Sequence, residues 1–207
     1  MVENFLKAKR LPETLKVWVN TSLEEGEQLV DGFSGATPLG DAVQGGVNAI
    51  PSVMESIIGF IPGSIGETSI IAIGLGAILL LATGIASWRI ILSTFIGGYL
   101  MGVVFNLAAG DNLFMQVPAM HQLMLGGFAF GAIFMATDPV TGTQTNAGKW
   151  AYGLLIGILA ILIRVANPAY PEGMMLAILI GNVTAPLIDH IVIQSNIKKR
   201  LKRVKTA

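Results

Sequence analysis

The sequence contains no cysteine, only two histidines and few charged residues. Without cysteine the chain supplies no disulfide and no thiolate ligands for zinc or an iron–sulfur cluster, so any redox cofactor must be organic or held by a neighbouring protein. The histidines, His121 and His190, are too few and too far apart in sequence to indicate a metal cluster. Lys plus Arg balance Asp plus Glu at 13 each, so the net charge does not favour a nucleic-acid partner.

Hydrophobic residues, in contrast, make up 53% of the 207 positions, and charged residues only 13%. Residues 1–67 are polar or amphipathic, and apolar runs of membrane-spanning length follow: 69–87, 90–108, 119–137, 151–166 and 174–193. Each run approaches the roughly 20 residues that a helix needs to cross a bilayer, and none alternates like an outer-membrane strand. The sequence therefore predicts an all-α integral membrane protein with about five transmembrane helices. Glycines within the runs, such as Gly97 and Gly98, predict close helix packing.

Charge placement predicts the orientation. Arg89 and Lys149 lie on the side of the basic tail, residues 196–207, whereas Asp111 and Glu172 lie on the other side. By the positive-inside rule the tail is cytoplasmic, and an odd number of spans then places residues 1–67 outside. We expect an extracytoplasmic or interfacial segment over 1–67, a helical bundle over 68–195 and a cytoplasmic tail over 196–207. Residues 61–69 predict a Pro-Gly turn followed by a helix start with Glu67 in its first turn. This helix start is either a plain capped entry into the first span or a site that binds an anion.

The segment 31–37, DGFSGAT, is the most informative stretch of the sequence. Gly32 and Gly35 permit a tight backbone, and the small residues before Thr37 leave its hydroxyl accessible. Such a hydroxyl can be esterified to a phosphate, although a Gly-Ala-Thr turn alone favours an ordinary loop.

DGFSGAT resembles the acceptor motif of bacterial flavin transferase, which moves FMN from FAD onto the final Thr or Ser. The resemblance implies covalent FMN on Thr37, recognised through Asp31, Gly32, Ser34, Gly35 and Ala36. Residues 134–146, 167–176 and 181–190 also resemble the B-type subunits of the sodium-translocating NADH:quinone reductases. The related D-type subunits of Rnf complexes share part of these stretches, but NPAYPEGMM over 167–175 fits the B-type subunits better.

This resemblance implies a bacterial inner-membrane subunit that passes electrons from NADH toward quinone, coupled to sodium export. Its implied partners are a flavin-bearing C-type subunit, an NADH-oxidising F-type subunit, the flavin transferase, quinone and Na⁺. Members of the family are considerably longer and have further spans before the flavin loop. We therefore expect this chain to correspond to their C-terminal half and to share any riboflavin with the N-terminal half.

Ionisable residues at membrane depth are candidates for function. Arg164, at the predicted outer end of the fourth span, could bind the flavin phosphate. Alternatively, its long side chain could place the guanidinium group at the membrane–water interface. Asp138 and Asp189, near the cytoplasmic ends of the third and fifth spans, offer oxygens for a sodium pathway. The alternatives are helix capping by Asp138 and pairing of Asp189 with the basic tail. Neutral oxygens nearby in the sequence belong to Thr137, Thr141, Asn182 and Thr184.

Three other functions remain open on the sequence. An Rnf-type subunit would serve ferredoxin and NAD. A solute channel or transporter would also suit glycine-rich helices and a broken-helix entry. A structural membrane subunit would carry no cofactor. Only the flavin hypotheses give the Thr37 hydroxyl a task.

Overall fold

The computed structural model describes residues 37–45, 50–61, 63, 64, 66–110, 112, 114–167 and 172–206. Within these ranges every regular element is helical, which confirms the predicted all-α class. The elements, in order, are α3 (Pro38–Gly45), α4 (Val53–Ile58), α5 (Ile70–Ala82), α6 (Trp88–Leu107), α7 (Ala119–Met124), α8 (Phe128–Phe130), the π-helix η2 (Gly131–Met135), α9 (Asn146–Ala166) and α10 (Met174–Thr206).

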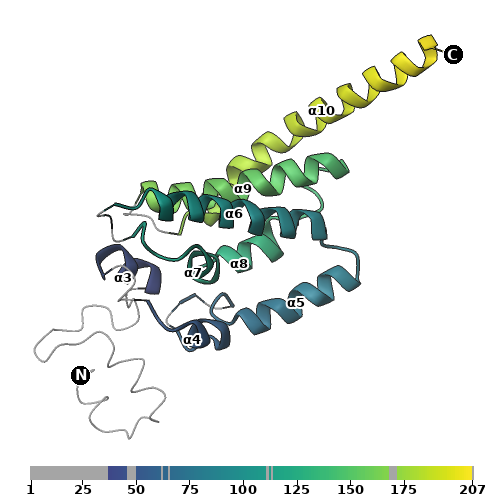
Figure 1. The fold of residues 1–207 in the computed structure, drawn as a ribbon. Coiled ribbons are helices and arrows are strands. Elements are labelled where there is room, and N and C mark those ends of the chain that lie inside the picture. The colour runs from purple at the N-terminus through teal and green to yellow at the C-terminus, as the bar shows by residue number, and fades with distance from the viewer. Residues whose placement is uncertain are drawn as a thin grey trace, which may run out of the picture.

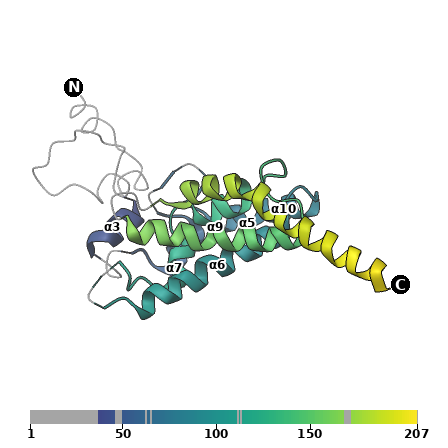
Figure 2. The ribbon, with the colours of Figure 1, turned by 90° about the horizontal axis from the view of Figure 1, so that it is seen from above.

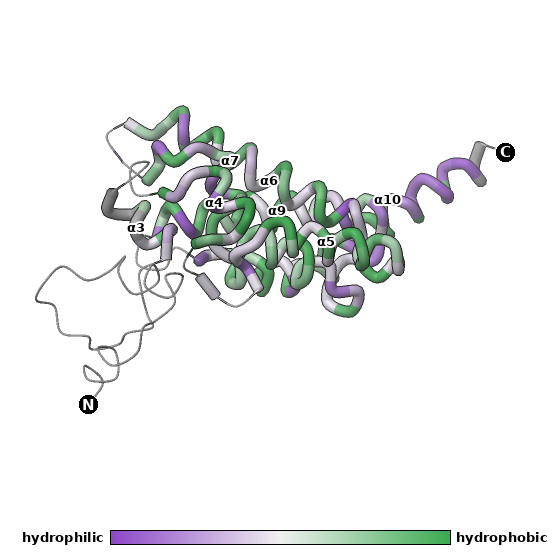
Figure 3. Tube along the Cα trace, turned by 90° about the horizontal axis from the view of Figure 1, so that it is seen from below, coloured by the Kyte–Doolittle hydropathy of each residue, from purple (hydrophilic) through white to green (hydrophobic). Residues whose placement is uncertain are grey.

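Three of these helices are long and apolar enough to cross a membrane: α6 with 20 residues, α9 with 21, and α10 over Met174–Arg203. At 1.5 Å per residue a 20-residue helix is about 30 Å long, the thickness of the hydrocarbon core. They confirm the second, fourth and fifth predicted spans. Figure 3 shows hydrophobic residues along the bundle and hydrophilic residues along the far end of α10.

Helices α6 and α9 lie side by side and form the centre of the bundle, with α10 against α9 (Figures 1 and 2). Glycine allows this approach. A Cβ atom on Gly97 would lie 2.5 Å from the carbonyl oxygen of Leu154, and one on Gly157 would lie 2.6 Å from the amide nitrogen of Gly98. Because helices in lipid gain little from hydrophobic burial, backbone proximity and dispersion hold this pair together. The glycines thus have the packing role that the sequence predicted.

Helix α5 is the least buried of the apolar helices. It has 13 residues, which is about 20 Å of helix and short of a full bilayer crossing. Ile73 is its only buried residue, whereas Leu75, Ile78 and Leu79 are exposed. The first predicted span, 69–87, is therefore a shorter helix with an apolar outer face. It begins at Ile70, so Glu67 precedes the helix, and the prediction that Glu67 lies in its first turn is wrong.

The third predicted span, 119–137, is not one continuous helix. Helix α7 ends at Met124, Leu125 is extended, and Gly126 has φ +62° before α8 and η2 resume the helical course. A break inside an apolar segment is tolerated only where protein satisfies the freed carbonyl groups. Here the Arg164 guanidinium donates hydrogen bonds to the carbonyl oxygens of Gln122 and Leu125. The correction to the prediction is thus a helix broken at Leu125–Gly126 and capped by a side chain from α9.

The two ends of the bundle differ in their polar groups. At one end α6 and α9 both begin, and the rings of Trp88 and Trp150 meet edge to face at 5.9 Å between centroids. Helix α10 continues past this end to the C-terminus, while α3 lies at the other end (Figure 1). Arg89, Lys149 and the basic tail therefore share one end, as the sequence predicted.

Candidate functional site

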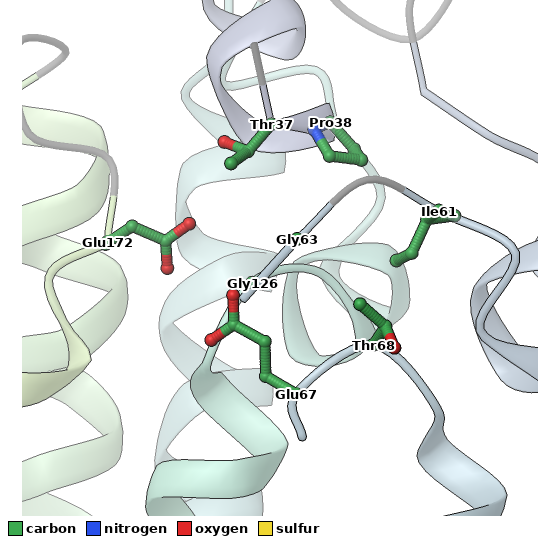
Figure 4. A pocket seen from close by; sticks show the side chains of 8 residues that line it. All are labelled: Thr37, Pro38, Ile61, Gly63, Glu67, Thr68, Gly126 and Glu172. Atoms are coloured by element: carbon green, nitrogen blue, oxygen red, sulfur yellow. The ribbon is translucent and has the colours of Figure 1, made fainter. Parts of the chain in front are cut away.

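Thr37 lies at the edge of a small pocket at the end of the bundle opposite the basic tail. The pocket is lined by Thr37, Pro38, Ile61, Gly63, Glu67, Thr68, Gly126 and Glu172 (Figure 4). These residues come from the start of α3, the segment before α5, the break after α7 and the segment before α10. The site is thus built from four parts of the chain that are far apart in sequence.

Local structure fixes the position of the Thr37 hydroxyl. Thr37 immediately precedes α3, and its Oγ1 accepts a hydrogen bond from the backbone N–H of Gly40 at 3.3 Å. This is an N-cap, and Pro38 occupies the first helical position, where its missing N–H costs nothing. The hydroxyl therefore lies at the partly positive N-terminus of a helix of eight residues. The predicted recognition residues Asp31, Gly32, Ser34, Gly35 and Ala36 lie outside the described residues.

Helix α3 is anchored to the bundle by its apolar side. Leu39 is 1% exposed and Ala42 is fully buried, and both belong to the main hydrophobic cluster with Phe114 and Val117. Burying a leucine side chain stabilises such docking by about 2 kcal/mol. The core therefore holds Thr37 at the end of the bundle.

Two carboxylates face the same pocket, and the sequence did not identify either as a site residue. Glu172 accepts a hydrogen bond from the Gly127 amide at 3.3 Å, and Glu67 accepts one from the Ser64 amide at 2.9 Å. Gly126 has φ +62°, which favours glycine, and a Cβ atom there would lie 2.7 Å from Oε2 of Glu172, so glycine allows both the turn and the close approach of this carboxylate. In the sequence Glu172 served only as a topology marker, and the signal for a site would have been its place beside the glycine pair 126–127.

Arg164 does not line this pocket in the structure. Its side chain is fully buried and donates to the α7 carbonyl groups described above. Glu172 is close enough to interact with it electrostatically. Arg164 thus stabilises the turn at Gly126 by binding the carbonyl groups just before it. Its contact with a flavin phosphate stays a prediction.

Asp138 and Asp189 lie at the opposite end of the bundle, where they hold one loop. Asp138 accepts hydrogen bonds from the Thr141 hydroxyl at 2.7 Å and from the Thr141 amide at 3.1 Å. These hydrogen bonds hold the pKa of the Asp138 carboxyl below its ordinary value of 3.8, and the bond from the Thr141 hydroxyl has the largest effect. Asp189, on α10, accepts bonds from the amides of Gln144 and Thr145 and from the Thr145 hydroxyl. No helix begins directly after Asp138, so these hydrogen bonds hold a turn and the helix-capping alternative for Asp138 is wrong. Asp189 binds the loop just before α9.

The neutral oxygens suggested for a sodium pathway have other partners. Thr137 and Thr184 donate to the carbonyl groups of Ile133 and Gly181 in their own segments, and the Asn182 side chain accepts from the Tyr152 hydroxyl at 2.5 Å. Over the described part of the chain, no three His, Cys, Asp or Glu side chains gather as a metal centre. The sodium role of Asp138 and Asp189 stays a prediction.

The residues at Thr37 fit a phosphate ester. A hydroxyl at a pocket edge is a suitable attachment point, and the N-terminus of α3 favours the negative charge of the phosphoryl group. Glu67 and Glu172 act in the opposite direction, because their charges repel a phosphoryl group in the same pocket. Attraction between the phosphoryl group and the N-terminus of α3 therefore has to outweigh its repulsion by these two carboxylates.

Comparisons with known proteins agree with this picture. The family model described as "NQR2, RnfD, RnfE family" matches residues 5–198. The chain is 53% identical over 179 residues to the B-type subunit of the Na(+)-translocating NADH-quinone reductase of Azotobacter vinelandii, covering 84% of this chain and 44% of that protein. It is 51% identical over 177 residues to the corresponding protein of Chromohalobacter salexigens, covering 84% and 43%. The chain thus spans less than half the length of these relatives. It belongs to the NQR2, RnfD, RnfE family.

Proposed function

We propose that this chain is a membrane redox subunit of a sodium-translocating NADH:quinone reductase, with FMN esterified to Thr37. It receives electrons that originate from NADH through partner subunits, a flavin-bearing C-type subunit and an NADH-oxidising F-type subunit, and passes them toward riboflavin and quinone. Relatives at about half identity are named as the B-type subunit of this enzyme. The three long apolar helices agree with a place in the bacterial inner membrane.

The observation that carries the proposal is the position of the Thr37 hydroxyl. It caps α3 and faces a pocket, and the buried face of α3 fixes it against the bundle. Flavin supplies one- and two-electron chemistry when it is bound. The protein supplies placement: Leu39 anchors the helix that carries Thr37, and the Gly40 amide donates to Oγ1. Arg164 and Glu172 hold the Gly126–Gly127 turn on the other side of the pocket.

The two ends of the bundle support an orientation. Helix α3, which Thr37 caps, lies at one end, and the C-terminal part of α10 extends from the other (Figure 1). Asp138 and Asp189 bind the loop before α9, at the end from which α10 extends. Because basic segments stay on the cytoplasmic side, the tail is cytoplasmic and Thr37 faces outward. In this orientation Asp138 and Asp189 meet Na⁺ from the cytoplasm, the side from which an exporter takes its ion.

A test of covalent flavin uses fluorescence after denaturation. The complex containing this chain is produced with flavin transferase, denatured in SDS and viewed under ultraviolet light on the gel. The band of this chain fluoresces in the wild type and in Thr37→Ser, because both keep a hydroxyl, and does not in Thr37→Ala. Thr68→Ala is a matched control, since Thr68 lines the same pocket and should keep the signal. Fluorescence that persists in Thr37→Ala would show that the flavin is attached elsewhere.

The sodium role has a separate test. Asp138→Ala and Asp189→Ala should abolish sodium uptake by proteoliposomes, while NADH-dependent quinone reduction in detergent is retained in part. Full sodium transport by both variants would remove these carboxylates from the pathway.

A further inference from the structure

The Asp189 carboxylate is almost fully engaged by the loop between η2 and α9. It accepts hydrogen bonds from the Gln144 amide at 2.8 Å, the Thr145 amide at 3.1 Å and the Thr145 hydroxyl at 2.5 Å. A carboxylate has about four acceptor positions, so three donors from one loop leave little room for another ligand. We call this set, Asp189 with Gln144 and Thr145, the Asp189 latch.

Thr145 connects the latch to α9. Its hydroxyl donates to Asp189 and accepts from the Gly148 amide at 3.1 Å, which makes Thr145 the N-cap of α9. Gly148 is needed at this point, because a Cβ atom there would lie 2.8 Å from Oδ1 of Asp189. The latch therefore ties α10 to the first turn of α9.

One oxygen beside the latch has no partner. Thr143 is 1% exposed, and its Oγ1 makes no hydrogen bond among the described residues. Its Cβ lies 3.3 Å from the point where a Gly148 Cβ would be, and Asp189 Oδ1 lies 2.8 Å from the same point. A buried hydroxyl without a partner is costly, and a ligand that bound to it would remove that cost. Lys149, on the first turn of α9, is the cation close enough to affect Asp189 electrostatically.

We propose that Na⁺ and the 144–145 segment compete for the Asp189 carboxylate, so that ion binding releases the latch and Thr145 sets the sodium affinity. This inference rests on the sodium role in the proposed function. The N–H and O–H donors occupy three of about four acceptor positions on the carboxylate, so a cation that takes these positions displaces the donors. Na⁺ prefers oxygen ligands, and the Thr143 hydroxyl supplies a neutral oxygen with no bond to break. Release of the loop also frees the first turn of α9 from α10.

Hydrogen exchange tests the competition directly. The whole complex is incubated in deuterated buffer with NaCl or with choline chloride, and exchange is followed by mass spectrometry in peptides covering residues 140–149. The amides of Gln144 and Thr145 should exchange faster in Na⁺, because the ion takes their acceptor. Asp189→Asn should show no difference between the salts. Equal or slower exchange of these amides in Na⁺ would overturn the proposal.

Two neighbouring substitutions of the same type should act in opposite directions. Thr145→Val removes a hydrogen bond to a charged group, so the KM for Na⁺ should fall about tenfold. Thr143→Val removes the uncommitted oxygen, so the KM for Na⁺ should rise. Loss of the α9 cap alone would lower kcat or the yield of complex and leave the KM for Na⁺ unchanged. Thr145→Ser keeps the hydroxyl and should restore the wild-type KM.

The control is Thr83→Val, in which the lost hydroxyl donates only to backbone carbonyls at the end of α5. An unchanged or higher KM for Na⁺ in Thr145→Val would refute the competition, and an unchanged KM in Thr143→Val would remove Thr143 from the site. If turnover of the wild-type complex does not depend on Na⁺ at all, the proposed sodium function itself is wrong.

Discussion

Replacing Gly157 by alanine should destabilise the bundle at the contact between α6 and α9. The new Cβ would lie 2.6 Å from the Gly98 amide nitrogen and closer still to the carbonyl oxygen of Thr94, whereas ordinary contact begins at 3.4 Å. Both neighbours are backbone atoms, so the overlap is relieved only by moving the helices apart. Overpacking of this kind costs about 3 kcal/mol, and the better helix propensity of alanine returns about 1 kcal/mol, so we expect a net loss of about 2 kcal/mol.

The matched control is Gly74→Ala on α5, where a Cβ atom would meet nothing within 4 Å. Only the propensity gain of up to about 1 kcal/mol applies there. Purified complexes in detergent would be heated in steps, and the fraction still intact would be read on a native gel. Gly157→Ala should dissociate at a lower temperature than the wild type, and Gly74→Ala at the same or a higher one. A Gly157→Ala complex as stable as the Gly74→Ala complex would refute the close contact between α6 and α9.

Three further changes probe the break after α7 and the loop at the other end. Arg164→Met leaves two buried carbonyl groups without their donor, at about 1–3 kcal/mol each, and should reduce the yield of folded protein; Arg164→Lys, which keeps the charge without the fork, should recover part of it. Gly126→Ala forces alanine to φ +62° against the Glu172 carboxylate and should cost at least about 1–2 kcal/mol in thermal denaturation, with a wild-type melting curve as the refuting result. Because the pKa of Asp138 is lowered, its contribution to stability is present above the ordinary value of 3.8 and is lost as the pH falls through the lower folded-state pKa. Thr141→Val should raise that pKa toward 3.8 in a carbon NMR titration, and an unchanged pKa would contradict the assigned cause.

The long helices could be predicted from the sequence because membrane crossing depends on length and apolarity, which hydropathy measures directly. The same measure failed at 119–137. Its residues are apolar enough for a span, but the backbone turns at Gly126, and the side chain that satisfies the freed carbonyls is Arg164 on another helix. A contact between residues about 40 positions apart leaves no periodic trace in the sequence.

For the region around Thr37, too, the sequence predicted part of the arrangement and missed the rest. Charge placement predicted that Thr37 and the basic tail lie on opposite sides, and α3, which Thr37 caps, lies at the end of the bundle opposite the C-terminal part of α10 (Figure 1). Glu67 and Glu172 were missed as neighbours of Thr37, because their approach depends on the turn at the glycine pair 126–127. For Asp189 the sequence left open a sodium role or pairing with the basic tail. The structure pairs its carboxylate with two backbone amides and a hydroxyl, which no charge count reveals.

Helix α10 runs unbroken for 33 residues and contains Pro186, a residue that cannot donate a backbone hydrogen bond. A proline within a helix is a point of weakness about which the following turns can tilt. Because the stretch from Pro186 to Arg203 is about 25 Å long, a tilt of about 10° would swing the cationic end by about 4 Å. Asp189 lies within the first turn after the proline, so its hydrogen bonds to Gln144 and Thr145 hold α10 in place just beyond the residue that interrupts its backbone hydrogen bonding.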